Sequence, residues 1–235
     1  FPLDHSIWEA QVATFASQRR VLAPDLVGFG TSTGAVRASV DDHADDLAGL
    51  LDALGIRRVV PVALSMGGYV TLALWRRHRD RIAGMVLVCS RAGPDAEASR
   101  AARYQMAISV ERKGVASIAD ALLPRLTAPN APESLRTRLR DVMHRQPPEG
   151  VIAALKAMAA RPSARGELVT IDVPTLVIAG EQDEVIPVAS SVAIADAIPG
   201  SQLEVVPDAG HVVPLEAPDA FNRVLASFLD DVDAE

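Results

Sequence analysis

The stretch Val62-Ala63-Leu64-Ser65-Met66-Gly67-Gly68 decides how the rest of this 235-residue chain is interpreted. An apolar run precedes Ser65 and a helical pattern follows it, so this serine lies at a strand-to-helix turn. The residues two positions away on either side are alanine and glycine, as a sharp turn around a strained serine requires. Such a turn points the hydroxyl at open space beside a helix N-terminus, which stabilises developing negative charge. We interpret Ser65 as a nucleophile; the alternative is that it merely caps the helix.

His211 is the candidate base for that nucleophile. A serine hydroxyl is a weak nucleophile at neutral pH and needs a base beside it. Among the five histidines of the chain, His211 follows the apolar run 203–206 and precedes a helical pattern. This position places it at the carboxyl edge of a sheet, the same edge as Ser65. His43 instead lies among acidic residues of a helix, where we expect it to be exposed.

Asp183 is the candidate acid that orients the histidine. A carboxylate in this role fixes the imidazole tautomer and stabilises the imidazolium. Asp183 follows the apolar run 175–179 in the segment Gly180–Pro187, far enough beyond the glycine to turn inward. Local rivals for the same role are Glu181, Glu184 and Asp208.

Apolar runs typical of buried strands alternate with helical patterns along the chain. This alternation indicates a mostly parallel sheet that helices cover on both faces, an α/β fold. The predicted strands span 20–23, 59–64, 85–89, 175–179 and 203–206. The predicted core helices span 6–15, 40–54, 66–77, 187–197 and 218–229, with Ser39 as an N-cap and Gly55 just after a helix end.

The stretch 93–168 has no strand pattern. Proline and glycine divide it into helical pieces over 96–110, 115–123, 132–145 and 148–161. We interpret it as a helical cap inserted into a core that residues 1–92 and 169–235 form. Such a cap would lie over the carboxyl ends of the strands, where ligands bind in open α/β sheets.

Composition limits the partners of the chain. A net charge of −7 disfavours nucleic acid and anionic membrane surfaces as partners. The single cysteine, Cys89, cannot form an internal disulfide, and its apolar surroundings predict a buried packing residue. No run is long and apolar enough to span a membrane and no signal peptide opens the chain, so we expect a cytoplasmic protein. The oligomeric state stays open, a homodimer included.

No cofactor site is predicted. The chain has no cluster of histidine, cysteine and carboxylates at the spacing of metal ligands. Gly28 and Gly30 follow a predicted strand, but the third glycine of a dinucleotide-binding loop is absent, so they are interpreted as turn residues.

Five segments together resemble the α/β-hydrolase superfamily over essentially the whole chain. Ser65, Asp183 and His211 stand in the chain order of that fold, although Ala63 replaces the glycine usual at the start of the nucleophile motif. The branch it is similar to contains small bacterial arylesterases, cofactor-free haloperoxidases (perhydrolases) and enol-lactone hydrolases. The segments are PLDHSIWEAQ (2–11), RVLAPDLVGFGTS (20–32), VALSMGGYV (62–70), LVIAGEQDEVIP (176–187) and DAGHVVPLEAPDAFN (208–222).

The resemblance also implies an oxyanion hole. Family members carry His-Gly just before the segment that here begins at Phe1, and the next residue donates a backbone N–H to the oxyanion. The resemblance thus assigns the two donors to Phe1 and Met66. In the family, the strand leading into His-Gly lies between those corresponding to 20–23 and 59–64. We therefore expect native residues before Phe1.

These residues predict the hydrolysis of small carboxylic esters through an acyl-enzyme on Ser65. Enol-lactone hydrolysis and perhydrolysis remain alternatives, as does a lyase or acyltransferase that uses the same three residues. A carboxylated lactone would need an arginine from the insertion, and Arg100, Arg103 and Arg112 are candidates. A non-enzymatic ligand-binding protein is the remaining alternative, against which the complete Ser–His–Asp set argues.

Overall fold

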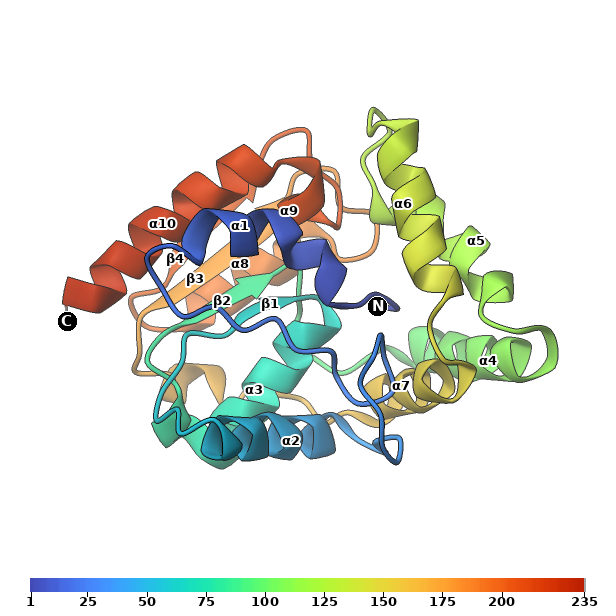
Figure 1. Ribbon diagram of the computed structural model, residues 1–235, viewed down its shortest axis with the longest axis horizontal. Coiled ribbons are helices and arrows are strands. Elements are labelled where there is room, and N and C mark those ends of the chain that lie inside the picture. Colours follow the sequence, from blue (N-terminus) through green and yellow to red (C-terminus); the bar gives the residue numbers. More distant parts are fainter. Residues whose placement is uncertain (235) are drawn as a thin grey trace.

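Four parallel strands form the sheet in the computed structural model, which describes residues 1–234 (Figure 1). Their spatial order is β1 (Val62–Leu64), β2 (Met85–Val88), β3 (Thr175–Gly180) and β4 (Gln202–Val206). The register pairs Leu64 with Val88 and Gly180 with Val206, so neighbouring strands end side by side. The parallel sheet predicted from the sequence is confirmed, with its carboxyl edge formed by the residues that follow each strand.

Helices cover both faces of this sheet. Successive strand residues point to opposite sides, so apolar side chains on both faces need a covering layer. Met85, Leu87 and Val177 pack with α2 (Val40–Ala53), α3 (Met66–His78) and α8 (Val188–Ala197). Val86, Val88 and Ile178 pack on the other side with α1 (Glu9–Phe15) and α10 (Pro218–Ala234), which lie together above the sheet in Figure 1. The shorter helices are η1 (His5–Trp8), η2 (Arg79–Arg81), η3 (Leu168–Thr170) and α9 (Val213–Glu216).

Helix α2 begins and ends as its sequence predicts, but one of its residues is placed differently. Ser39 accepts the N–H of Asp42 and the Asp42 side chain accepts the N–H of Ser39, a capping box. Gly55 follows the helix end at φ 64°. His43 was expected to be exposed, and this prediction was wrong: its exposed fraction is 1%. The helical period places it on the face of α2 that packs against α3, beside the buried Ala44.

The predicted helical pieces of residues 93–168, which we call the cap, each contain a helix. These are α4 (Glu97–Lys113), α5 (Ala116–Leu126), α6 (Glu133–His144) and α7 (Pro148–Ala160). They lie together beyond the carboxyl ends of the strands (Figure 1). Helix α5 runs past Pro124 instead of ending before it.

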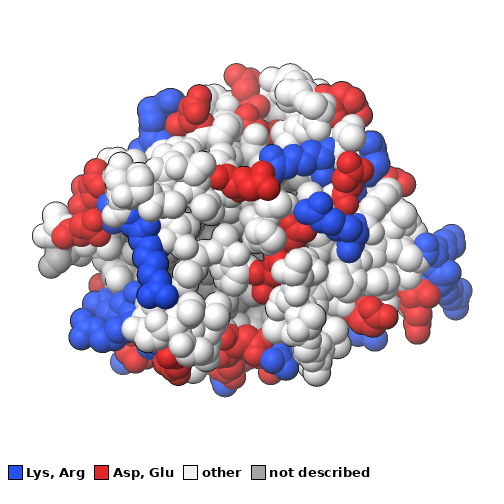
Figure 2. Space-filling model, viewed as in Figure 1, with Lys and Arg blue, Asp and Glu red and all other residues white. Residues whose placement is uncertain are grey.

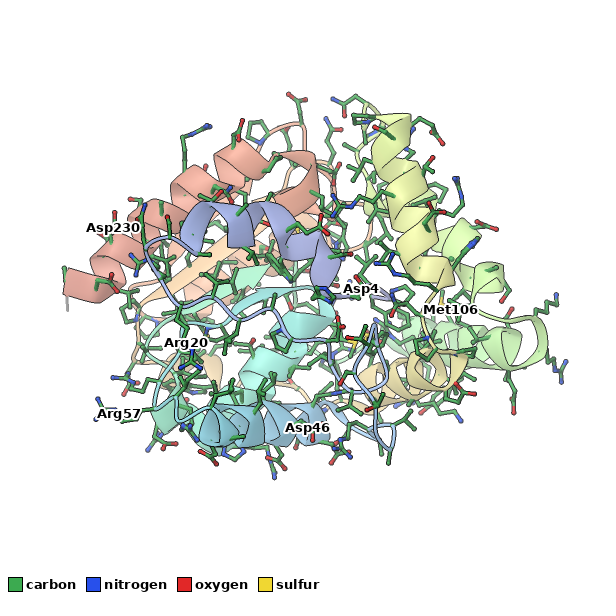
Figure 3. All side chains as sticks on the ribbon, in the orientation of Figure 1. Asp4, Arg20, Asp46, Arg57, Met106 and Asp230 are labelled. Carbon is green, nitrogen blue, oxygen red and sulfur yellow. The ribbon has the colours of Figure 1, made fainter. Side chains whose placement is uncertain are left out.

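A buried carboxylate, Asp4, joins the N-terminal segment to the cap (labelled in Figure 3). It accepts hydrogen bonds from Ser6, from Arg145 at 3.0 Å and from Gln146 at 3.0 Å. Burial by itself would raise the pKa of Asp4, but the hydrogen bonds from Ser6, Arg145 and Gln146 hold it below its ordinary value of 3.8. This carboxylate is therefore charged at neutral pH and fastens the α6–α7 junction to the core.

A second buried carboxylate, Asp95, lies where the chain enters the cap. It accepts a hydrogen bond from Arg161 at 2.9 Å and another from Arg103. The Arg161 guanidinium also lies 4.1 Å from the centre of the Tyr69 ring in α3. Entry and exit of the cap are thus joined to each other and to the core helix α3.

Two strand predictions need correction. Residues 20–23 form no strand, since this extended segment pairs with no other strand among the described residues. The run 203–206 was expected to be buried, yet Leu203 and Val205 are each 38% exposed because β4 is an edge strand.

A cavity of about 680 Å³ lies between the extended segment 20–26 and β1, and residues of α1 and α10 also line it. In the family that the sequence resembles, a further strand lies between these two segments. Figure 2 shows this face of the molecule hollowed between uncharged side chains. Among the described residues, no helix combines the length and apolar character needed to cross a membrane.

Candidate active site

Ser65 directly follows β1 and adopts a backbone conformation that is rare for a residue with a side chain. Its φ is 54° and its ψ is −109°. Backbone strain of this kind persists only where the surrounding structure holds it. Here the Ser65 N–H donates to the Val88 carbonyl at 2.8 Å, and the Ser65 carbonyl accepts the Gly68 N–H at 2.9 Å. The Ser65 side chain makes no capping hydrogen bond to α3, which argues against the helix-cap interpretation.

A close approach between α3 and the end of β2 supports this turn. The Ser90 hydroxyl donates to the Ser65 carbonyl at 3.0 Å. A Cβ atom on Gly68 would lie 2.3 Å from Ser90 Oγ, so only glycine fits at position 68. A Cβ atom on Gly67 would lie 3.5 Å from that of Ala63, an ordinary contact. The tightest packing of the motif is therefore one residue later than the sequence predicted.

The loops after β3 and β4 bring Asp183 and His211 into contact. His211 Nδ1 lies 2.8 Å from Asp183 Oδ2, and the two side chains are 2% and 1% exposed. The other carboxylate oxygen of Asp183 accepts the N–H groups of Val185 and Ile186 at 2.7 and 2.9 Å. Because both oxygens are engaged, the carboxylate orientation is fixed and the Nδ1 side of the imidazole is held.

The rival acids of the sequence analysis do not contact the histidine. Glu181 is exposed and accepts the N–H of Asp208 at 3.2 Å. Asp208 is itself exposed and accepts a hydrogen bond from Gln182 at 3.3 Å. Glu184 is exposed as well. Of these candidates, Asp183 has the contact that the role of orienting acid requires.

Ser65 and the Asp183–His211 pair lie at the same edge of the sheet, where β1, β3 and β4 end. Within residues 1–234, no hydrogen bond joins the Ser65 hydroxyl to His211. Such bonds are often long in a free enzyme and shorten when substrate binds. Proton transfer from the serine would require the Ser65 hydroxyl and the free ring nitrogen of His211 to come within hydrogen-bonding distance.

Cys89 is a neighbour of this pair that the sequence analysis treated as a packing residue. It is buried, as predicted, and has a φ of 45° at the end of β2. Its sulfur, an Asp183 oxygen and a His211 ring nitrogen all lie within 4.8 Å of one another. Burial and then the charge of Asp183 hold the pKa of the Cys89 thiol well above its ordinary value. The sulfur is therefore protonated and a poor nucleophile.

Within residues 1–234, two side-chain groups have the spacing of a metal site, but their atoms already have other partners. In the group of Cys89, Asp183 and His211, the carboxylate oxygens already accept hydrogen bonds and the thiol is protonated. The other group consists of Asp4, His5 and Asp25, whose carboxylates accept several N–H and O–H donors. In both groups a metal ion would have to displace the hydrogen-bond donors that already bind the carboxylates, and in the first group the Cys89 thiol would also have to lose its proton.

The two expected oxyanion donors belong to residues beside the cavity. Met66 is the first residue of α3 and is buried. The ring of Phe1 packs edge-on against Phe29, with the ring centres 6.1 Å apart. Phe1, Phe29 and Met66 all line the 680 Å³ cavity.

The arginines considered for a carboxylated substrate are largely occupied. Arg100 pairs with Glu97 on the cap surface, and Arg103 pairs with Asp95 at the cap entrance. Arg112 is exposed in the last turn of α4. Two of the three arginines are therefore paired with carboxylates.

Known proteins resemble this chain over almost its whole length. A sequence model described as the alpha/beta hydrolase family matches residues 1–224. The chain belongs to this family. A solved structure of a thermophilic esterase from Thermogutta terrifontis, with malate bound, is 40% identical, with a TM-score of 0.94 and coverage of 99% of this chain and 87% of the other.

Two further relatives of this alpha/beta hydrolase are lactonases. The enol-lactonase from Burkholderia xenovorans is 32% identical, with a TM-score of 0.90 and coverage of 97% and 88% of the two chains. The 3-oxoadipate enol-lactonase 1 of Acinetobacter baylyi is 28% identical over 232 residues, 97% of this chain and 85% of its own length. The chain is thus a hydrolase-family member with esterase and lactonase relatives.

Proposed function

We propose that this alpha/beta hydrolase is a carboxylic ester hydrolase that uses Ser65, His211 and Asp183. The observation that carries the proposal is the contact between Asp183 and His211 at the strand ends, at the same edge of the sheet as a serine held at positive φ. Each of the three follows a different strand of one parallel sheet. The esterase relative at 40% identity supports the choice of an ester as substrate.

The reaction would run through an acyl-enzyme. The Ser65 oxygen attacks the ester carbonyl while His211 Nε2 accepts its proton, which gives a tetrahedral oxyanion and an imidazolium. Asp183 stabilises that imidazolium through Nδ1. His211 then returns the proton to the leaving alcohol as the C–O bond breaks, and water repeats the sequence to release the acid and free Ser65.

Two backbone N–H groups would stabilise the oxyanion, those of Met66 and Phe1. Met66 begins α3, whose N-terminal dipole favours negative charge at this point. One such donor contributes roughly 10²–10³ in turnover. The role of Phe1 rests on the resemblance alone.

The test is ester turnover by the wild type and by Ser65→Ala. A panel of p-nitrophenyl acetate, butyrate and a branched acyl ester is measured against lactones of similar size. We expect ester turnover by the wild type and a loss of about 10⁴-fold or more in Ser65→Ala. Ser163→Ala, which changes an exposed serine of the loop after α7, is the matched control and should be active. Equal rates for Ser65→Ala and the wild type would contradict the proposal.

Enol-lactone hydrolysis is the second candidate. The two lactonase relatives, matched over at least 97% of this chain, favour it. The same three residues would open a cyclic ester, with the ring oxygen as the leaving group. A kcat/KM for lactones above that for every open-chain ester in the panel would assign this activity instead.

A further inference from the structure

The carboxylate of Glu216, at the end of α9, has no role in the proposed chemistry but binds the backbone around it. Its Oε1 accepts the N–H of Gly210 and the N–H of Val212, each at 3.1 Å. These are the residues immediately before and after His211. A single oxygen thus holds the backbone on both sides of the proposed base.

The other oxygen of the same carboxylate binds the cap. Glu216 Oε2 accepts the N–H of Ala128, in the loop between α5 and α6, at 2.6 Å. The cap lies directly against the histidine loop here, because a Cβ atom on Gly210 would be 2.5 Å from the Ala128 nitrogen. The Val212 N–H also donates to the Leu126 carbonyl at 3.2 Å.

The surroundings of Glu216 oppose a negative charge on its side chain. Burial raises the pKa of this carboxyl above its ordinary value even though three N–H groups bind it, and the nearby charge of Asp183 acts in the same direction. A residue needed only to fill space would be more stable if it were uncharged. All three N–H groups need an acceptor oxygen in this buried place, and the two oxygens of Glu216 supply it.

We propose that Glu216 is a positioning residue that sets the place of His211 and makes it depend on the seating of the cap. The Thr127–Pro129 segment is the cap end of this link. Arg136 of α6 holds that segment by donating to the Ala128 and Pro129 carbonyls at 3.1 and 2.9 Å. Movement of the cap at this point reaches the backbone around His211 through the Glu216 carboxylate, and also through the hydrogen bond between Val212 and Leu126. The inference rests on the proposed role of His211.

The first test is Glu216→Gln, measured as kcat/KM per active site titrated with an organophosphonate. Two esters of one acid are compared, an alkyl ester and a p-nitrophenyl ester, with the acyl group taken from the best substrate of the panel. The alkyl alcohol needs a proton from His211 to leave, whereas p-nitrophenolate leaves without one. We expect kcat/KM to fall roughly 10–100-fold for the alkyl ester and clearly less for the aryl ester. A change in the amount of folded enzyme would leave the ratio unaltered.

The second test acts on the cap end and leaves the histidine loop intact. Arg136→Ala should lower the alkyl-to-aryl ratio in the same direction, by about threefold. Arg138→Ala is the matched control, because Arg138 lies on the same helix but binds Ser6 and Glu9 of the core instead. Glu181→Gln, an exposed carboxylate beside the loop, is the control for the charge change. Both controls should leave the ratio unchanged.

The outcomes separate the two proposals. If Ser65→Ala retains the wild-type rate, the proposed function fails. If Ser65→Ala is inactive but Glu216→Gln and Arg136→Ala leave the ratio unaltered, only the positioning role fails. An equal change in Arg138→Ala would also overturn it, since loosening the cap anywhere would then suffice. Should Glu216→Gln not fold, Arg136→Ala against Arg138→Ala decides.

Discussion

At the carboxyl edge of the sheet, the buried carboxylate of Asp183 faces an imidazole, whereas at the seam between cap and core Asp4 and Asp95 face arginines. An arginine is always charged, so each seam carboxylate is permanently neutralised. An imidazole gains its charge only when it takes a proton. Asp183 can therefore pair with an imidazolium that forms during the reaction. Asp4 and Asp95 are already paired with arginines that join the cap to the core.

This difference predicts which property of the protein should change when each carboxylate is removed. Loss of a carboxylate at the edge should change the reaction while the fold persists. Loss of one at the seam should change the free energy of unfolding while the reaction of the folded molecules persists. The comparison would fail if loss of an edge carboxylate mainly unfolded the protein, or if loss of a seam carboxylate mainly slowed the reaction of folded molecules.

The largest effect is expected for Asp183→Asn. The amide can still accept the N–H groups of Val185 and Ile186, so the loop should keep its fold. It cannot stabilise an imidazolium, and kcat/KM should fall about 10⁴-fold. Steady-state ester kinetics measure this, with the exposed Glu184→Gln as the control. A loss under tenfold, or one that unfolding accounts for, would contradict the account.

A large effect on stability is expected for Asp95→Asn. The change leaves Arg103 and Arg161 without their buried carboxylate, which should lower the free energy of unfolding by about 3–5 kcal/mol. Urea unfolding measures it. Asp230→Asn removes a surface partner of Arg19 whose side chain is 79% exposed and should cost under about 1 kcal/mol. Equal costs in the two variants would refute the distinction between a buried and a surface pair.

A smaller, pH-dependent effect is expected for Asp4→Asn. The folded pKa of Asp4 lies below 3.8, so its stabilisation is present above that value and is lost as pH falls through the folded pKa. Near pH 6 the variant should be less stable by about 1–3 kcal/mol. The difference between variant and wild type should shrink as pH falls below 3.8, which urea unfolding at a series of pH values measures. A difference that does not vary with pH would show that the Asp4 charge contributes nothing.

The edge of the sheet could be predicted from the sequence, and the seam could not. Ser65 and Asp183 follow apolar runs closely, so their place at a strand end is a local property of the chain. Asp95 and Arg161 are 66 residues apart, and Asp4 and Gln146 are 142 apart. No local pattern joins such pairs, because they meet only after the cap has folded against the core.

Errors in the local predictions have the same cause. The run 20–23 has the composition of a strand, but a strand also needs a hydrogen-bonding neighbour, and this segment borders the cavity. His43 has acidic neighbours in sequence, yet the packing of α2 on α3 decided its burial. Glu216 gave no signal, since its partners are backbone groups of two loops.

The most direct test of the central claim is covalent labelling of the native protein by a fluorophosphonate. The Ser65 oxygen should bond to phosphorus and displace fluoride, while His211 takes the serine proton. The account predicts one label per chain, found by peptide mass spectrometry on Ser65, with no label in Ser65→Ala and far slower labelling in His211→Ala. A label on another residue, or equal labelling rates in the wild type and His211→Ala, would contradict it.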